Sequence, residues 1–374
     1  MSRLSCLGSP GANITVRPDW FVLSDGAAAA VPPLIREGKP AAAEKVKVFI
    51  DHETPCGSEG VAMKQRALIR FAEKHGCELF NGYGVSYQIM LDRFVRPGEI
   101  VAHCGDFGSI YGSAGALPLR LTPEEMAAAL QSGTAACTVP ETAVLELTGA
   151  LRAPACGKDA ALTFLAQAGG LGGKLLTVCG EGLAGMDRGD RIAFFQMLSA
   201  GGCCGALAAA ERQSGTWKLE LSTVAPVVSK AGDLQSAVPA ENLGDMEITA
   251  AFVGGCSSGR IEDIRKAAAL IKGKRVSKNV RLLVAFATTE AYIQAADEGL
   301  IGTLMDAGAI VMNQGCSACY AHSQGLVDGK DIVLSAGSRS CPNCNGEGDA
   351  KTYLCSAGTA IASAIAGYVR QPEN

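Results

Sequence analysis

Short apolar runs alternate with stretches of helical periodicity along most of this chain. The segments KVKVFI (residues 45–50) and EIVAHC (residues 99–104) have the composition of strands, and each ends in a polar or glycine-rich loop. Between them, residues 60–76 show a helical pattern that ends at His75 and Gly76, the cation and the glycine typical of a helix C-terminus. This alternation of strands and helices predicts an α/β fold with mainly parallel sheets.

Two further helices have recognisable starts. Residues 121–133 place Thr122 as an N-cap ahead of a proline and two glutamates in the first turn. Residues 260–274 carry an apolar stripe on one helical face and acidic residues at the positive end of the helix. A strand-like run, residues 246–256, comes just before this helix. Cys256 is therefore expected at the carboxyl end of a strand, where α/β sheets place their ligands.

Composition narrows the class of protein. Apolar residues make up 48% of the 374 residues and charged residues 19%, which is typical of a well-packed globular protein and argues against disorder. The net charge is −4 and no basic block occurs, so no nucleic-acid partner is expected. No apolar run is long enough to cross a membrane, and the N-terminus lacks a signal-peptide pattern. We therefore expect a cytoplasmic protein without a membrane partner.

Fifteen cysteines are the most unusual feature of the composition. Their odd number and the missing secretion signal argue against a disulfide framework. Cys256 precedes a predicted helix N-terminus, whose partial positive charge favours a thiolate. Cys316 and Cys319 form a Cys-x-x-Cys pair after another predicted strand. Three such thiolates can hold a cubane iron–sulfur cluster and leave one iron open to a substrate.

A second Cys-x-x-Cys pair, Cys341 and Cys344, allows a different interpretation. Twenty-one residues separate Cys319 from Cys341, which is close to the spacing of a structural zinc site. Taken alone, the C-terminal segment favours zinc. The residues by themselves thus leave a four-thiolate zinc site and a three-thiolate cluster both open.

Several longer segments resemble the large subunit of the aconitase superfamily, in particular the 3-isopropylmalate dehydratase and homoaconitase type. The resemblance spans residues from about 14 to 367, and the pieces occur in the family's order and spacing. They are VRPDWFVLSD, FIDHETP, GVSYQIMLDRFVRPGEIVAHCGD, GGCSSGRIEDIRKAAALIKGKRV, EGLIGTLMDAGAIVMNQGCSAC and GSRS.

This resemblance implies a fold, a cofactor and a partner. The expected architecture is an aconitase-like arrangement of three α/β/α domains, over residues 1–138, 139–240 and 241–374, with a 4Fe–4S cluster at the domain interface. The cluster ligands implied are Cys256, Cys316 and Cys319. The chain lacks the family's swivel domain, so a separate small subunit is expected to complete the substrate pocket.

The family's catalytic positions carry over only in part. Asp51 and His52 match its Asp-His pair, and Asp106 matches the aspartate of its Asp-Ser-His-Thr motif. The Ser-His that should follow Asp106 is replaced, and Tyr87 stands where the family has a histidine. Tyr87 and Ser109 are therefore candidates to replace the missing groups in proton transfer or hydrogen bonding.

The expected substrate-binding residues show a similar mixture. Arg339 matches the first substrate-clamping arginine, with Ser338 beside it, and Arg260 lies in the segment similar to Cys-Thr-Asn-Ser-Arg. The second clamping arginine falls near Cys344, and the expected helix carboxylate falls near Ala200. These departures predict a changed substrate. They also make Cys341 and Cys344 candidates for additional metal or thiol ligands.

Two classes of function follow. The first is an iron–sulfur hydro-lyase, a dehydratase or isomerase that acts on a small hydroxy acid by Lewis-acid activation of a hydroxyl at an open iron. The second is a diverged metal-binding protein with the same fold, in which thiolates fully coordinate a cluster or zinc for a redox or sulfur-handling role. The retained arginine and Asp-His pair favour the first class, and the gained thiols favour the second.

Overall fold

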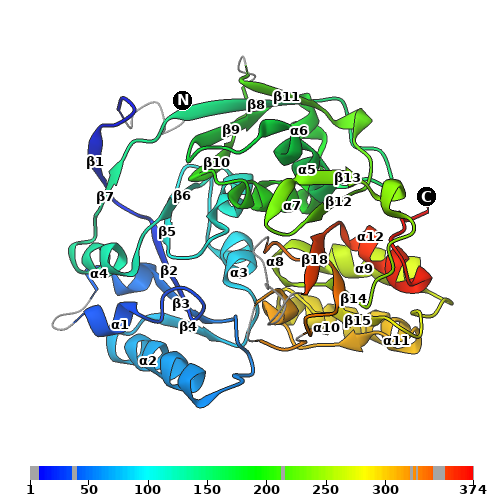
Figure 1. The fold of residues 1–374 in the computed structure, drawn as a ribbon. Coiled ribbons are helices and arrows are strands. Elements are labelled where there is room, and N and C mark those ends of the chain that lie inside the picture. Colours follow the sequence, from blue (N-terminus) through cyan, green and yellow to red (C-terminus); the bar gives the residue numbers. More distant parts are fainter. Residues whose placement is uncertain are drawn as a thin grey trace.

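The described part of the chain contains three larger β-sheets with helices packed on them and one two-stranded sheet (Figure 1). The computed structural model describes residues 8–35, 40–211, 215–320, 323–325, 327–339 and 350–373. Most neighbouring strands are parallel, so the predicted α/β fold with mainly parallel sheets is confirmed. No helix within those described ranges is long and apolar enough to span a membrane.

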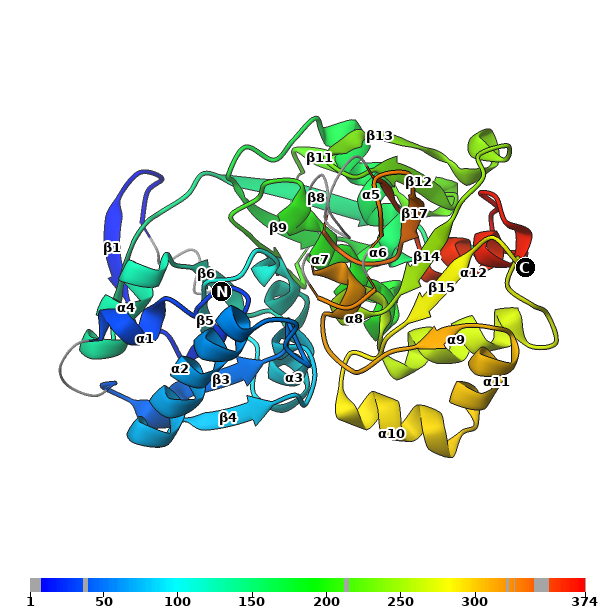
Figure 2. The same cartoon turned by 60° about the horizontal axis from the view of Figure 1, so that its bottom comes forward.

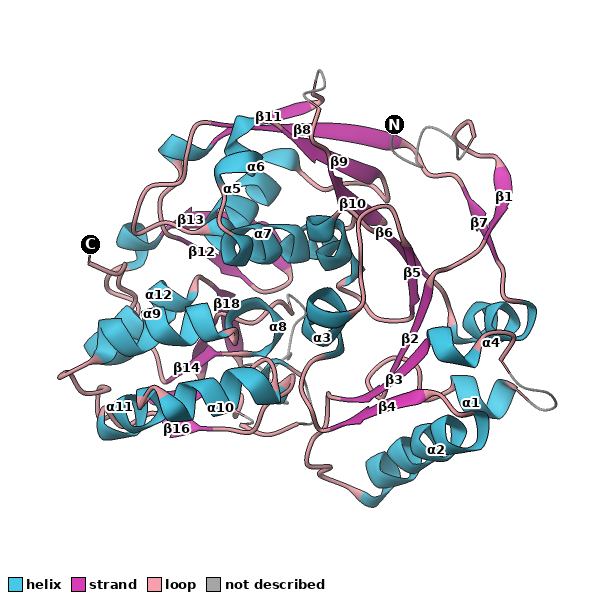
Figure 3. Cartoon of the chain, turned by 180° about the vertical axis from the view of Figure 1, so that it is seen from behind, coloured by secondary structure: helices cyan, strands magenta, loops and turns pink. Residues whose placement is uncertain are grey.

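The first sheet is entirely parallel and has the strand order β4-β3-β2-β5-β6. Its strands are β2 (Trp20–Ser24), β3 (Val46–Ile50), β4 (Glu78–Asn81), β5 (Ile100–His103) and β6 (Leu117–Arg120). One face is covered by α1 (Val31–Leu34), α2 (Glu59–His75) and α4 (Pro123–Ser132), and the other by α3 (Ser86–Arg93) and the 3-10 turn η3 (Gly108–Ala114) (Figure 3). This second face matters for function, because its core also contains Cys256 and Cys316.

Local signals account for the ends of these helices. Gly76 follows α2 in the left-handed conformation, with φ of 69°, which a glycine adopts without strain. Thr122 caps α4 and forms a capping box with Glu125. Both predicted helices are therefore confirmed to within a residue or two of their expected ends.

The second sheet is also parallel and has the order β10-β9-β8-β11. It consists of β8 (Thr142–Thr148), β9 (Leu175–Cys179), β10 (Gly205–Ala208) and β11 (Trp217–Glu220). The helices that accompany it are α5 (Gly157–Ala168), α6 (Glu181–Gly185) and α7 (Arg188–Ala200). A short antiparallel pair, β1 (Asn13–Val16) and β7 (Ala135–Thr138), lies in the segment before this sheet.

The third sheet is the largest, with the order β13-β12-β18-β17-β14-β15-β16. Its strands are β12 (Val227–Lys230), β13 (Asp233–Pro239), β14 (Ala250–Val253), β15 (Arg281–Val284), β16 (Ile310–Val311), β17 (Ile332–Ser335) and β18 (Lys351–Leu354). Its helices are α8 (Gly255–Ser258), α9 (Ile261–Ile271), α10 (Thr289–Asp297), α11 (Leu300–Asp306) and α12 (Ala357–Ala366).

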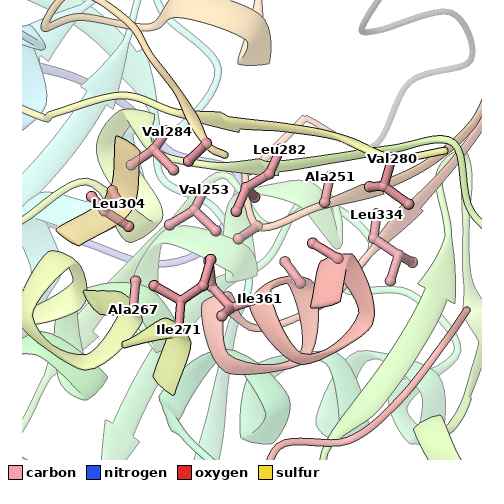
Figure 4. Close-up of a cluster of buried hydrophobic side chains, with 14 of the residues drawn as sticks. Ala251, Val253, Ala267, Ile271, Val280, Leu282, Val284, Leu304, Leu334 and Ile361 are labelled. Atoms are coloured by element: carbon pink, nitrogen blue, oxygen red, sulfur yellow. The ribbon is translucent and has the colours of Figure 1, made fainter. Parts of the chain in front are cut away.

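Alternating residues of the central strand β14 serve two different cores. Ala251 and Val253 pack with Ile271 of α9 and Ile361 of α12 in a fully apolar layer (Figure 4). Phe252 points to the opposite face, where the core includes Cys319. One face of this sheet therefore stabilises the fold, and the other is close to the thiols.

The stretch 229–245, expected to be a linker because it is charged and contains serine and proline, folds as sheet instead. Most of it forms β12 and β13, which pair antiparallel with each other, and β12 also pairs with β18. Backbone hydrogen bonding to an exposed sheet edge requires no apolar sequence, so composition alone misses it. The three-domain division with boundaries at 138 and 240 stays a prediction.

Candidate functional site

Three cysteines from two separate segments meet between the first and third sheets. Cys256 lies in α8, directly after β14, while Cys316 and Cys319 border the 3-10 turn η6 (Ser317–Cys319) that follows β16. A Cβ placed on Gly255 would lie 3.6 Å from the carbonyl oxygen of Cys316 and 3.7 Å from the Cβ of Cys319. All three cysteines are buried. Figure 2 shows α8 and the segment after β16 lying between the N-terminal and C-terminal parts of the chain.

Glycines make this meeting of segments sterically feasible. Gly255 has φ of 64°, a conformation that L side chains rarely adopt, and it lets the chain turn from β14 directly into α8. A Cβ on the preceding Gly254 would stand 2.8 Å from atoms of Ala285 on the neighbouring strand. The Gly-Gly pair therefore brings Cys256 to the sheet edge in one tight step.

The sulfurs of the three cysteines influence one another electrostatically in this buried environment. Burial and the neighbouring sulfurs of Cys316 and Cys319 raise the pKa of Cys256 to about 12. Negative charge on these thiols thus requires a bound cation.

Two glutamines that the sequence interpretation overlooked surround Cys256. Gln196 of α7 donates a hydrogen bond to the Cys256 sulfur, and Gln88 of α3 donates to the Cys256 carbonyl oxygen at 2.7 Å. Both side chains are buried, and their amide oxygens lack a hydrogen-bond partner in the described structure. Unpaired buried acceptors of this kind are rare in native proteins. The available signal was a lone polar residue inside the apolar run AFFQML.

Two carboxylates fix the imidazole of His52. Its Nδ1 lies 2.6 Å from an oxygen of Asp51 and 3.4 Å from an oxygen of Asp25. Asp25 also accepts the backbone N–H groups of Asp51 and His52 at 3.1 and 3.0 Å, and it was not singled out from the sequence. Burial would lower the pKa of His52, but Cys316 and Asp51 outweigh it and raise that pKa well above 6.5. A charged imidazole is therefore available beside the thiols.

The structure brings this histidine close to a predicted cluster ligand. Single ligand atoms of Asp51, His52 and Cys316 all lie within 4.8 Å of one another, and all three residues are buried. The backbone N–H of Cys316 donates to the carbonyl oxygen of Asp51 at 2.9 Å, which ties the two segments together. The Asp-His pair and the Cys-x-x-Cys pair thus form one site.

Arg339 and Ser338, both predicted to bind substrate, lie close to the converging thiols. The hydroxyl of Ser338 is 3.8 Å from the Cys256 sulfur. The Arg339 guanidinium stands over the ring of Tyr320, 4.6 Å from its centroid, and 3.9 Å from an oxygen of Asp106. The ring of Tyr320 in turn packs edge-on against His52 at 4.8 Å. Arg339 is therefore held in place near the thiols with its charge only partly balanced.

Three other predicted site residues are engaged in local contacts. The hydroxyl of Tyr87 accepts the backbone N–H of Phe107 at 3.1 Å, and burial raises the pKa of Tyr87. Ser109 lies 3.2 Å from the sulfur of Cys203. Arg260 bonds the carbonyl oxygens of Cys256 and Ser257 and pairs with Asp263 at 2.9 Å. Tyr87 and Arg260 thus hold backbone next to the site, whereas Ser109 contacts another side chain.

Asp106 and Ser109 also line a cavity of about 490 Å³ beside the site. The cavity lies between β6, β7 and the end of α7, and its walls include His103, Cys203 and Cys204. None of the three converging thiols contributes to it. The second Cys-x-x-Cys pair, Cys341 and Cys344, lies outside the described residues.

Comparison with known proteins identifies the class. Residues 216–367 match the model of the aconitase family (aconitate hydratase). A probable 3-isopropylmalate dehydratase large subunit of Methanothermobacter thermautotrophicus is 31% identical over 358 residues, which cover 88% of this chain and 85% of that protein. The chain belongs to the aconitase family.

Within this family the similarity is to large subunits. The 3-isopropylmalate dehydratase large subunit 2 of Archaeoglobus fulgidus is 29% identical over 396 residues, covering 97% of this chain and 94% of that one. The homoaconitase large subunit of Thermus thermophilus is 28% identical over 361 residues, covering 90% and 86%. The crystal structure of Thermococcus kodakaraensis aconitase X shares the fold, with a TM-score of 0.57 at 13% identity over 98% of this chain and 89% of that chain.

Proposed function

We propose that this chain is the large subunit of an iron–sulfur hydro-lyase that adds or removes water at a small hydroxy acid. The observation that carries the proposal is the meeting of three buried thiols with the Asp51–His52 pair. The relatives named as dehydratase and homoaconitase large subunits support the same class of reaction.

Cys256, Cys316 and Cys319 are the residues that would hold a 4Fe–4S cluster. Their buried, all-thiol donor set fits such a group, and so does the amide N–H of Gln196, which donates to the Cys256 sulfur. When bound, the cluster supplies an iron without a protein ligand, which acts as a Lewis acid toward the substrate hydroxyl.

His52 is the proposed proton donor to the leaving hydroxyl. Asp51 and Asp25 hold its Nδ1, so the ring cannot rotate, and its raised pKa keeps a proton on it at neutral pH. General acid catalysis of this kind contributes roughly 10²- to 10⁴-fold to a rate.

Arg339 is the proposed anchor for a substrate carboxylate. Its guanidinium is fixed by Tyr320 and by Asp106 at 3.9 Å, a distance too long for a full hydrogen bond. A substrate carboxylate that replaces Asp106 at the guanidinium gains charge-assisted hydrogen bonds. Ser338, next in the chain, offers a hydroxyl toward the same region.

A separate small subunit is the proposed partner. The relatives that match most of this chain are named large subunits, which implies a second polypeptide in those enzymes. We propose that the partner closes the substrate pocket over the side that carries Arg339 and His52.

A second candidate function is supported by the contacts of Tyr87 and Ser109. Tyr87 accepts the backbone N–H of Phe107 beside Asp106, and Ser109 contacts the Cys203 sulfur, so both hydroxyls are engaged where the family's acid–base residues are replaced. A protein of this fold that no longer dehydrates would bind its cluster or zinc with thiolates alone, for a redox or sulfur-handling role.

Metal analysis separates the two functions. Protein purified without oxygen should contain about four irons per chain with matching sulfide, and mild oxidation should produce the paramagnetic signal of a three-iron cluster as one iron leaves. Zinc without sulfide, or a cluster that keeps all its iron, would overturn the hydro-lyase. An ultraviolet assay for unsaturated acids, run on a panel of hydroxy acids with the small subunit added, then identifies the substrate.

A further inference from the structure

A lysine is buried completely between the second and third sheets. Lys158 lies in the first turn of α5, is 2% exposed, and is among the largest fully buried side chains of the described structure. Lysines are almost never buried without a partner, because an isolated ammonium loses its hydration. The position of this charge therefore calls for an explanation.

The ammonium of Lys158 reaches the loop that borders the thiols. Its Nζ donates a hydrogen bond to the carbonyl oxygen of Gly337 at 2.5 Å. A Cβ placed on Gly337 would lie 2.7 Å from the sulfur of Cys319, so no other residue fits there without displacing that thiol. Ser338 follows, with its hydroxyl 3.8 Å from the Cys256 sulfur. The peptide that accepts from Lys158 thus touches two of the three converging cysteines.

Three cysteines and one carboxylate surround the Lys158 ammonium. Burial lowers the pKa of Lys158, and the electrostatic influence of its neighbours opposes that shift, in the order Cys355, Cys319, Cys156 and Asp159. Within the described ranges, no carboxylate oxygen lies at ion-pair distance from the ammonium. The carboxylate of Asp159, next in the chain, accepts the backbone N–H groups of Cys156 and Val227 instead.

We propose that Lys158 is a positioning residue for the cluster, whose ammonium holds the Gly337–Arg339 loop and balances the negative charge of the thiolate-bound cluster. The inference rests on the proposed function, since it requires that Cys256, Cys316 and Cys319 bind the cluster. A buried positive charge stabilises the more negative, reduced state of such a group and so raises its reduction potential.

Removal of the charge tests this directly. Lys158→Met keeps the length of the side chain without its charge, and Lys158→Gln keeps a donor for Gly337 without the charge. Lys158→Arg keeps the charge. Lys47→Met is the matched control, because Lys47 is also buried but lies in the first sheet, where it pairs with Glu78 at 2.8 Å. The measurement is the midpoint potential of the reconstituted cluster, followed by paramagnetic resonance, with iron content determined in parallel.

We expect Lys158→Met and Lys158→Gln to shift the equilibrium toward the oxidised cluster at least tenfold, which is about 59 mV for a one-electron couple. Lys158→Arg and Lys47→Met should stay near the unmodified protein. If Lys158→Met does not fold, Lys158→Gln carries the same comparison. Equal potentials in the charged and uncharged variants would overturn the role of Lys158 alone. An unmodified protein that takes up no cluster would overturn the proposed function itself, and this inference with it.

Discussion

Two groups of cysteines in this molecule differ in arrangement. Cys256, Cys316 and Cys319 are buried at loops that follow strands, and glutamine and serine side chains surround them. A second group lines the cavity on the other side of the Asp106 loop and consists of Cys137, Cys203 and Cys204.

The second group has local partners instead of a shared centre. The Cys203 sulfur donates to the carbonyl oxygen of Leu198 and contacts Ser109, both at 3.2 Å. The number of thiols therefore says little about a site. A site is defined instead by several loops at strand ends that bring their thiols to the same place.

The largest effect is expected when one of the three converging cysteines is replaced. Cys316→Ser should lower bound iron and sulfide at least tenfold, because a hydroxyl is a poor ligand for iron compared with a thiolate. Cys203→Ser, the matched control from the cavity, should keep its iron. Iron and sulfide analysis of both variants checks the prediction, and equal losses in the two would contradict the distinction between the groups.

Catalysis should depend on His52, which lies beside Cys316 of the first cysteine group. His52→Asn should reduce turnover of the substrate roughly 10²- to 10⁴-fold, since it removes the proton donor that Asp51 orients. The iron content should stay near that of the unmodified protein, because His52 is not one of the proposed cluster ligands. Full activity in this variant would exclude His52 as the acid.

A substitution in the cavity that Asp106 and Ser109 line should change the stability of the protein rather than its activity. His103 is buried, both its ring nitrogens lack a partner in the described structure, and burial, with a contribution from Arg120, lowers its pKa to about 4. The unfolded chain therefore binds the proton more tightly than the folded one between pH 6.5 and pH 4. The stability from a neutral His103 is present above pH 6.5 and lost as pH falls toward 4.

The size of this loss is about 2 to 3 kcal/mol between pH 7 and pH 4.5. Urea unfolding at the two pH values measures it. His103→Leu should flatten the dependence by that amount, whereas His75→Gln, at the half-buried end of α2, should leave it nearly unchanged. An equally steep profile in His103→Leu would show that other groups cause the acid sensitivity.

A smaller effect is expected at the substrate anchor. Arg339→Lys should raise KM by roughly tenfold to a hundredfold, the cost of losing one charge-assisted hydrogen bond, with little change in kcat. Arg370→Lys, whose side chain pairs with the exposed Glu373, serves as the control. Steady-state kinetics on the identified hydroxy acid measure this change in KM. An unchanged KM would show that Arg339 does not bind the substrate.

Much of the fold and part of the site were readable from the sequence. The helices that begin after Ser58 and Thr122 have local caps, and the strands beginning at Val46 and Ile100 are mostly apolar, with Lys47 and His103 as their polar members. Cys256 was recognisable because a strand, two glycines and a helix start surround it. These features depend on residues close together in the chain, whose short-range physics is the same in any context.

Only the tertiary structure decided which distant groups surround the thiols. Gln196 is 60 residues from Cys256, Gln88 is 168 residues from it, and Lys158 is 179 residues from Gly337. Contacts over such separations arise when whole sheets pack together, so no local pattern encodes them. The same packing determined that Tyr87 binds the Asp106 loop and that Ser109 contacts Cys203, while Asp25, which no motif singled out, holds the catalytic candidate His52.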